Sequence, residues 1–219
     1  MSLNISGTCF TNSDGLKYFR KGAIEVHLGS TGQKKQPLLS ANYIEVTLTA
    51  KAEYLKGRVE KSKTVAIDWS RTTAGDIGAT IPVFQLGAVF SPSLTYAQAK
   101  SFNGKLFFAS LSTAQVKRLL NTDAVHARQC LKDEGADGRI VTGVWCVLQA
   151  ELAASFDTAA SFSAASVASV LKLTVSGGTH GAQSITLEKG AVFAYRLSKV
   201  KDWDGDTVAD IEHDYSGLG

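Results

Sequence analysis

The segment from Arg139 to Asp157 places the strongest constraint on the fold, because its two halves follow different patterns. From Ile140 to Val147 almost every residue is apolar or small, which is typical of a strand buried on both faces. From Leu148 onward, apolar and polar residues alternate, which predicts that the strand continues with one apolar and one wet face. That extension fits either a soluble sheet packed on a helix or a strand of a membrane barrel, which needs roughly 9 to 11 alternating residues.

A second segment alternates over a longer run and predicts another long strand, because no helix has a period of two. Its apolar positions are Ile44, Val46, Leu48, Ala50, Ala52 and Tyr54. Residues 56–96 are rich in Gly, Ala, Ser and Thr, and residues 148–187 contain a similar Ser/Ala run before Leu171 and Leu173. Small-residue strands pack a core weakly, which suits segments that fold one way and later re-form as hairpins.

Composition places the chain among globular proteins. It has 219 residues, of which 44% are hydrophobic and 20% charged, with only three prolines, and this length suffices for one substantial core. It contains neither a run of roughly 18 apolar residues nor a signal-peptide core, so we expect a protein that is cytoplasmic when soluble. The three cysteines, Cys9, Cys130 and Cys146, lack paired spacing, which favours reduced thiols.

The net charge of +3 conceals an asymmetry along the chain. No Lys or Arg follows Lys201, so residues 1–201 carry +9 (+3 plus the 6 negative charges that follow). The six acidic residues after it are Asp202, Asp204, Asp206, Asp210, Glu212 and Asp214. A basic body with an acidic tail predicts an anionic partner, and a tail that competes with that partner.

Cations with aromatic neighbours cluster near the N-terminus. Residues 11–21 are expected to form a short helix capped by Asn12 or Ser13, with Lys17, Arg20 and Lys21 at helical spacing beside Tyr18 and Phe19. Such a face suits anionic lipid headgroups, to which each cation contributes about 1 kcal/mol. A solvated helix face is the alternative interpretation. Lys34 and Lys35 add charge in a following loop.

The middle of the chain changes to a helical period. After a strand at residues 106–111, Ser112 is positioned to cap a helix with its apolar face at Val116, Leu119 and Leu120. Thr122 or Asp123 is positioned to cap a second helix that ends at Gly135. Residues 191–197 are expected to form the strand that closes the sheet.

Catalytic and metal motifs are sparse. The four histidines fall in unrelated segments, and the pair His126 and Cys130 on one predicted helix face lacks a third residue to orient it, so we do not expect an enzyme. A calcium loop is an alternative use of the acidic tail. Thr207 stands where such a loop needs glycine, and His213 stands where it needs glutamate, so we favour no metal site. The aspartates at calcium-loop spacing are Asp202, Asp204, Asp206 and Asp210.

Several passages resemble the pore-forming domain of the gasdermin family. They are the helix VKRLL (residues 116–120), the passage LKDEGADGRIVTGVW (131–145) and the run QSITLEKGAVFAYRL (183–197), in which Gly190, Ala194, Tyr195 and Arg196 match the family's turn and closing strand. The first half is similar in layout only. The resemblance implies an α+β fold with a twisted antiparallel sheet flanked by helices, and two hairpin regions that refold into a membrane β-barrel.

The resemblance also implies a domain organisation and a set of functional residues. Residues 1–201 correspond to the pore-forming domain, and residues 202–219 are a candidate inhibitory tail. The expected membrane-binding residues are Lys17, Tyr18, Phe19, Arg20, Lys21, Lys34 and Lys35. The expected lipid face of the inserted hairpins is Ile44, Val46, Leu48, Leu148, Leu152, Phe156, Leu171 and Leu173. Cys9 is a candidate for acylation, with a buried thiol as the alternative.

The expected function is therefore a pore-forming cell-death effector that moves from the cytoplasm to the inner face of the cell membrane. Its implied partners are acidic lipids, copies of itself in the pore, and an activating protease or partner protein; no cofactor and no nucleic acid are implied. A β-rich binding or structural module that never inserts, and a calcium-dependent lipid-binding protein, are the alternatives.

Overall fold

The computed structural model describes residues 4–78, 80–87 and 91–218. Its central strand is β11 (Gly138–Leu148), and all 11 of its residues are buried. Adjacent residues of β11 face two hydrophobic clusters: Cys146 packs with Phe107 on one side, and Trp145 packs with Phe108 on the other. The predicted strand that is buried on both faces is confirmed.

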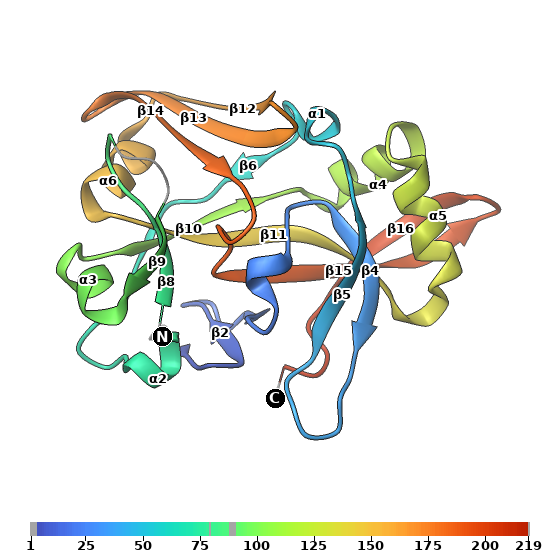
Figure 1. Cartoon of the computed structure of the whole chain (residues 1–219). Helices are drawn as coiled ribbons and strands as arrows, with labels where there is room; N and C mark the ends of the chain where they lie inside the picture. The colour runs from blue at the N-terminus through green and yellow to red at the C-terminus, as the bar shows by residue number, and fades with distance from the viewer. Residues whose placement is uncertain (1–3, 79, 88–90, 219) are drawn as a thin grey trace.

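Four strands pair with β11, two along each edge (Figure 1). β10 (Lys105–Ser110) and β4 (Ser30–Lys35) pair with successive parts of one edge. β15 (Ala194–Asp204) and β8 (Thr80–Phe84) pair with the other. Three of these pairings are antiparallel, but β8 runs parallel to β11, so the sheet is mixed rather than purely antiparallel as predicted.

Further strands extend the sheet outward from these neighbours. They are β1 (Asn4–Ile5), β2 (Cys9–Thr11), β3 (Lys17–Phe19), β5 (Tyr43–Thr49), β6 (Glu60–Lys61), β7 (Val65–Ala66), β9 (Ser91–Thr95) and β16 (Thr207–Asp214). β15 and β16 form a hairpin that contains most of the acidic C-terminal residues. The predicted boundary after residue 201 therefore lies inside β15, and residues 202–214 belong to the sheet instead of a separate tail.

A second sheet of three strands lies over the first (Figure 1). It consists of β12 (Ser161–Val167), β13 (Val170–Gly178) and β14 (Gly181–Leu187), joined by two hairpin turns. Alternate residues of β13, namely Leu171, Leu173 and Val175, are buried against the core, while the residues between them are half-exposed. This amphipathic sheet packs on α6 (Ala150–Thr158) and α1 (Ala52–Leu55).

Two longer helices cover the end of the main sheet near β16. α4 (Thr113–Thr122) begins at Ser112, whose side chain accepts a hydrogen bond from the Gln115 backbone N–H, and buries its predicted apolar face. α5 (Val125–Asp133) follows, but Ala124 precedes it without a side-chain cap, so the predicted cap at Thr122 or Asp123 is wrong. The remaining helices are α2 (Ala74–Ile77), α3 (Tyr96–Ser101) and the 3-10 turns η1 (Ala23–Glu25) and η2 (Gly135–Asp137).

The predicted extension of β11 beyond Leu148 is wrong, because residues 150–158 form α6. β11 ends before Gln149, whose backbone N–H donates to the Phe84 carbonyl and whose side-chain Oε1 accepts a hydrogen bond from the Leu86 N–H. The following sequence is rich in alanine, which favours helix and fits either period. Leu152 and Phe156, four residues apart, both point into the core.

Two other predicted elements also differ from the structure. The strand at residues 44–54 ends at Thr49, since Ala52–Leu55 turns into α1. The predicted helix at residues 11–21 is instead the hairpin of β2 and β3. Asn12 accepts hydrogen bonds from the backbone N–H groups of Asp14 and Leu16, so it closes a turn and does not start a helix. The α+β class itself holds, with most of the structure in sheet.

Candidate functional site

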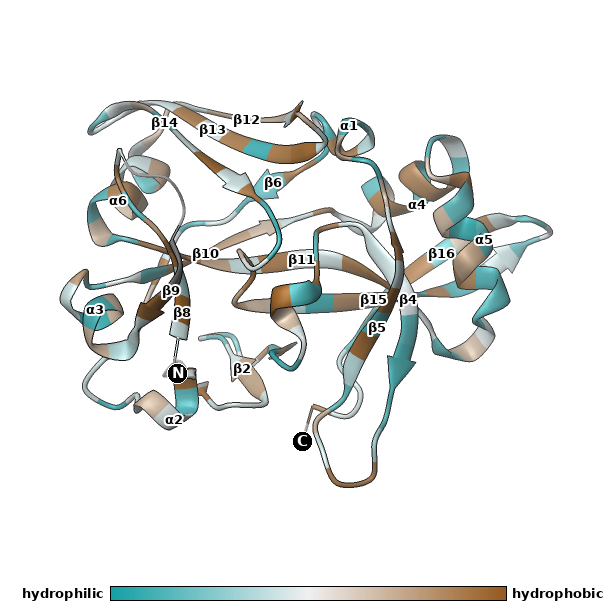
Figure 2. Cartoon of the chain, in the orientation of Figure 1, coloured by the Kyte–Doolittle hydropathy of each residue, from teal (hydrophilic) through white to brown (hydrophobic). Residues whose placement is uncertain are grey.

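The hairpin of β4 and β5 extends beyond the body of the molecule, near the C-terminus (Figure 1). We call its connecting loop, residues 36–42, the hairpin tip. Leu38 and Leu39 at the tip are 101% and 100% exposed, more than any other large hydrophobic residue that the structure describes. Figure 2 shows this hydrophobic turn at the far end of the hairpin. These two adjacent, fully exposed leucines are a candidate contact surface.

Two of the predicted membrane-binding lysines flank the hairpin tip. Lys21 donates a hydrogen bond to Ser40 Oγ, and its ammonium nitrogen lies 4.5 Å from the centre of the Tyr43 ring. Lys35 at the end of β4 pairs with Glu45, with 2.8 Å between Nζ and Oε2. Both lysines are partly exposed and border the hairpin tip, although Glu45 offsets the charge of Lys35.

Lys34 does not belong to this exposed surface, contrary to the prediction. Its side chain is 0% exposed, and its Nζ lies 2.7 Å from Asp214 Oδ2. The same ammonium group donates to the carbonyl oxygen and the Oγ of Ser216, each at 2.7 Å. Arg139 in β11 donates from Nε to the same Asp214 oxygen at 2.6 Å. We refer to Lys34, Arg139, Asp214 and Ser216 as the ionic cluster.

The ionic cluster holds the end of β4 that adjoins the hairpin tip to the C-terminal strand. Burial alone raises the pKa of the Asp214 carboxyl, but hydrogen bonds from Lys34, Ser216 and Arg139 outweigh that effect and hold the pKa well below its usual value. The carboxylate is therefore ionised and shared by two cations. Three strands far apart in the sequence, β4, β11 and β16, meet at this one group.

Tyr18, Phe19 and Arg20, which were predicted to meet lipid, are largely buried in this fold. Successive residues of a strand face opposite sides, so Tyr18 packs against Trp145 and Phe19 stacks on Tyr195. The Arg20 guanidinium donates to the Ile77 carbonyl at 2.6 Å and to the carbonyl oxygens of Ser6 and Asp76. Burial lowers the pKa of Arg20 to about 10. Lys17, at the edge, donates to the Leu218 carbonyl at 3.0 Å.

The residues predicted to form the lipid face of the inserted hairpins lie in one core cluster. Val46 and Leu48 in β5 are half-buried at its margin. The buried members are Ile44, Leu148, Leu152, Phe156, Leu171 and Leu173. In the structure these side chains pack against one another in the core and do not form a surface. Their contact with lipid stays a prediction.

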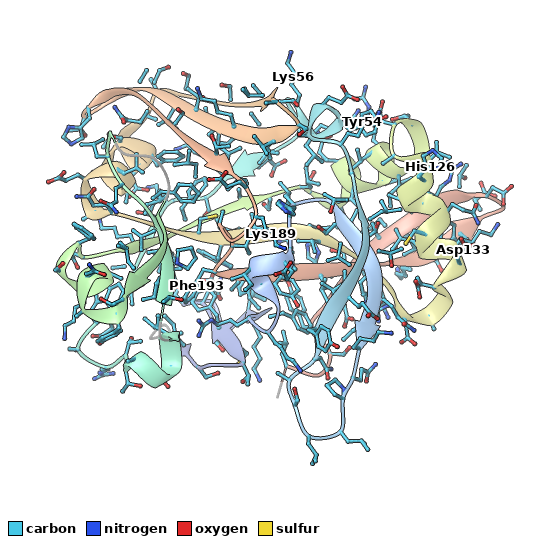
Figure 3. The ribbon with its side chains drawn as sticks, in the orientation of Figure 1. Tyr54, Lys56, His126, Asp133, Lys189 and Phe193 are labelled. Carbon is cyan, nitrogen blue, oxygen red and sulfur yellow. The ribbon has the colours of Figure 1, made fainter. Side chains whose placement is uncertain are left out.

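The remaining candidates are the aspartates at calcium-loop spacing and the pair of His126 and Cys130 on α5. Among the residues that the structure describes, no group of three or more His, Cys, Asp or Glu side chains is placed to hold a metal ion. Asp206 pairs with Lys132, and Asp210 pairs with Lys201 at 2.9 Å, while Asp202 and Asp204 lie exposed on β15. Figure 3 shows His126 and Asp133 on α5.

Cys9 is half-buried and borders a recess of about 300 Å³ beside Leu218. Its Sγ lies 3.5 Å from Ser6 Oγ. Acylation of this thiol stays a prediction. Cys130 is buried, and burial raises the pKa of its thiol, so it is not poised as a thiolate nucleophile.

Sequence reasoning missed the hairpin tip and the ionic cluster. The tip had a local signal, since Leu38 and Leu39 stand between Pro37 and Ser40 in a turn-forming stretch with no apolar periodicity. The ionic cluster had no local sequence signal, because Lys34 and Asp214 are 180 residues apart.

Comparison with known proteins found no matching family model, no matching curated protein and no matching solved structure. In the described residues, the helices are all too short or too polar to cross a bilayer.

Proposed function

We propose that this protein attaches to acidic membranes through the hairpin tip, assembles with copies of itself, and inserts strands that permeabilise the membrane. In this proposal it is a cell-death effector that moves from the cytoplasm to the inner face of the cell membrane. The observation that carries the proposal is the pair of fully exposed leucines, Leu38 and Leu39, bordered by Lys21 and Lys35.

The chemistry of the tip suits the boundary between headgroups and acyl chains. Burying a leucine side chain contributes about 1.5–3 kcal/mol, and each lysine near an anionic surface contributes about 1 kcal/mol. Two leucines and Lys21 therefore supply roughly 4–7 kcal/mol before the cost of ordering the loop and immobilising the protein, since Glu45 offsets the charge of Lys35. An apolar tip with a cationic border distinguishes anionic membranes from neutral ones.

The second sheet supports the insertion step. Its strands have 7, 9 and 7 residues, and the longest reaches the roughly 9 to 11 residues of a strand that crosses a bilayer. One face is apolar and the other polar, as in a barrel wall. The sheet contacts the body through side chains and little backbone pairing, because its three strands pair with one another and not with the main sheet.

The energy of this contact explains why insertion needs a membrane. Five large side chains anchor the sheet, and exposing them to water costs roughly 7.5–15 kcal/mol at about 1.5–3 kcal/mol each. They are Leu171, Leu173, Val175, Ile185 and Leu187. Lipid chains accept the same side chains at little cost, so detachment becomes favourable only at the bilayer.

The proposal is tested with dye-filled vesicles and the full-length protein. Vesicles that contain phosphatidylserine are expected to release their dye, whereas phosphatidylcholine vesicles are not, and electron microscopy of the treated anionic vesicles is expected to reveal rings. Binding to anionic vesicles without release would instead support a β-rich membrane-binding module. Absence of both binding and release would overturn the proposal.

A further inference from the structure

A recess of about 220 Å³ lies between the second sheet and the body of the molecule. The end of β5 and α1 form one wall, and the turn between β12 and β13 with the end of β14 forms the other. Seven of the ten described lining residues are apolar, including Leu55, Leu171 and Leu187, and the other three are His27, Thr49 and Ser169. A mostly apolar recess with a few polar groups has the composition of a small-molecule site.

The size of the recess limits the ligand. An apolar protein cavity of about 150 Å³ holds benzene, which has six non-hydrogen atoms. On the same scale, about 220 Å³ holds a molecule of roughly nine non-hydrogen atoms. Because the recess is open to solvent on one side, this volume describes the part of a ligand that the recess encloses.

The charge of the lining limits the ligand further. None of the ten described lining residues has a carboxylate, ammonium or guanidinium group. The nearby Lys189 is already paired with Glu25 at 2.7 Å, and Lys56 projects from the end of α1 away from the molecule (Figure 3). A charged ligand would lose its hydration without gaining a partner, and this loss is costly. The lining therefore favours an uncharged ligand.

The polar residues of the lining determine which functional group a ligand needs in order to form hydrogen bonds there. Burial is the main reason that the pKa of His27 is lowered, so the imidazole is neutral at pH 7 and offers one donor and one acceptor. Thr49 and Ser169 add two hydroxyl groups, although the Thr49 hydroxyl is also 2.9 Å from Ser30 Oγ and the Ser169 hydroxyl donates to the Ala168 carbonyl at 2.5 Å. A hydroxyl group on the ligand both donates and accepts, so it complements these residues.

We propose that this recess binds a small neutral alcohol of roughly nine non-hydrogen atoms, with its apolar part among Leu55, Leu171 and Leu187 and its hydroxyl at His27. The bound molecule contacts both walls and therefore holds the second sheet against the body. This inference does not depend on membrane permeabilisation, because it concerns the folded protein in solution.

The test uses 1-octanol as the probe and heptanoate, which has the same number of non-hydrogen atoms, as its charged counterpart. Octanol is expected to raise the midpoint of thermal unfolding in a saturable manner at pH 7.5, while heptanoate leaves it unchanged. Hydrogen exchange of the full chain is expected to slow in β13 and β14 when octanol binds. An equal shift with heptanoate, or no saturable shift with octanol, overturns the proposal.

Two variants place the binding in this recess. Ala52→Leu fills it from α1, and Val170→Phe fills it from β13; either folded variant is expected to lose the octanol-dependent shift. His27→Phe keeps the volume but removes the hydrogen bonds, so octanol is expected to bind roughly fivefold more weakly. A shift that persists in the filled variants would assign octanol to another site.

Discussion

The ammonium group of Lys34 lies 2.7 Å from the carboxylate of Asp214, and both side chains are buried, with exposures of 0% and 4%. Arg139 donates to the same oxygen at 2.6 Å. The single carboxylate therefore accepts hydrogen bonds from two buried cations and balances one of their two positive charges. Removing it leaves both cations without a counter-charge, which costs far more than the loss of a surface ion pair.

We expect Asp214→Asn to lower the free energy of unfolding by about 3–5 kcal/mol, because it keeps the shape of the side chain but removes its charge. Asp210→Asn on the same strand is the matched control: it breaks an ion pair with Lys201 whose side chains are 49% and 52% exposed, and we expect a loss below about 1 kcal/mol. Urea unfolding measures both. Similar losses in the two variants would contradict the role of the ionic cluster.

The lowered pKa of Asp214 also predicts how the stability of the protein depends on pH in acid. Its folded pKa is lowered, so it contributes stability that is fully present above the unfolded pKa of about 3.9 and is lost as the pH falls toward the lower folded pKa. We therefore expect the wild-type protein to lose stability steeply below about pH 4. The stability of the Asp214→Asn variant is expected to depend less steeply on pH in that range. Parallel curves of stability against pH for the two proteins would show that Asp214 is not the group responsible.

The lowered pKa of His213 predicts a second dependence of stability on pH, in a less acidic range. Burial, assisted by the charge of Arg196, lowers its pKa to about 4. The unfolded side chain titrates near pH 6.5, so the stability from the neutral ring is present above about pH 6.5 and is lost as the pH falls toward 4. Its Nδ1 lies 2.8 Å from Ser198 Oγ. His213→Asn preserves a polar atom at that position and is expected to flatten the stability curve between pH 6.5 and 4, measured by chemical unfolding.

The hairpin tip predicts a change in membrane binding without a change in stability. We expect the double substitution Leu38→Ser and Leu39→Ser to weaken binding to anionic vesicles at least about tenfold, because two leucines no longer enter the acyl region. Both side chains are fully exposed, so unfolding should shift by less than about 0.5 kcal/mol. Ile24→Ser, at a 56% exposed position away from the tip, is the control. Unchanged binding in a sedimentation assay would remove the tip from the interface.

The close packing of backbone around Gly32, in the middle of β4, predicts that a larger residue there destabilises the hairpin. Gly32 lies at an irregularity in the pairing of β4 with β5. A Cβ atom there would lie 2.0 Å from the Glu45 carbonyl oxygen. We expect Gly32→Ala to destabilise the protein by about 1–3 kcal/mol, because the added Cβ displaces backbone atoms and not a flexible side chain. At Gly7 the nearest atom is 3.7 Å from the added Cβ, so Gly7→Ala should be close to neutral in thermal unfolding.

Local sequence determined the elements whose signals do not depend on distant residues. β11 is recognisable because a run of apolar and small residues cannot be solvated on either face, and α4 is recognisable from the cap at Ser112 followed by an apolar face. The α+β class follows from these changes of period. Alanine-rich residues 150–158 were ambiguous, because small side chains fit both the strand and the helix period.

Tertiary structure alone decided which polar and apolar residues are exposed at the candidate site. From the sequence, Lys34 is expected to be a surface cation, but in the fold it pairs with Asp214 and Ser216 from the other end of the chain. Phe19 is expected to be a membrane anchor, but in the fold it stacks on Tyr195. Leu38 and Leu39 stay exposed because their loop extends past every element that was able to cover them. Burial depends on neighbours in space, and periodicity records only neighbours along the chain.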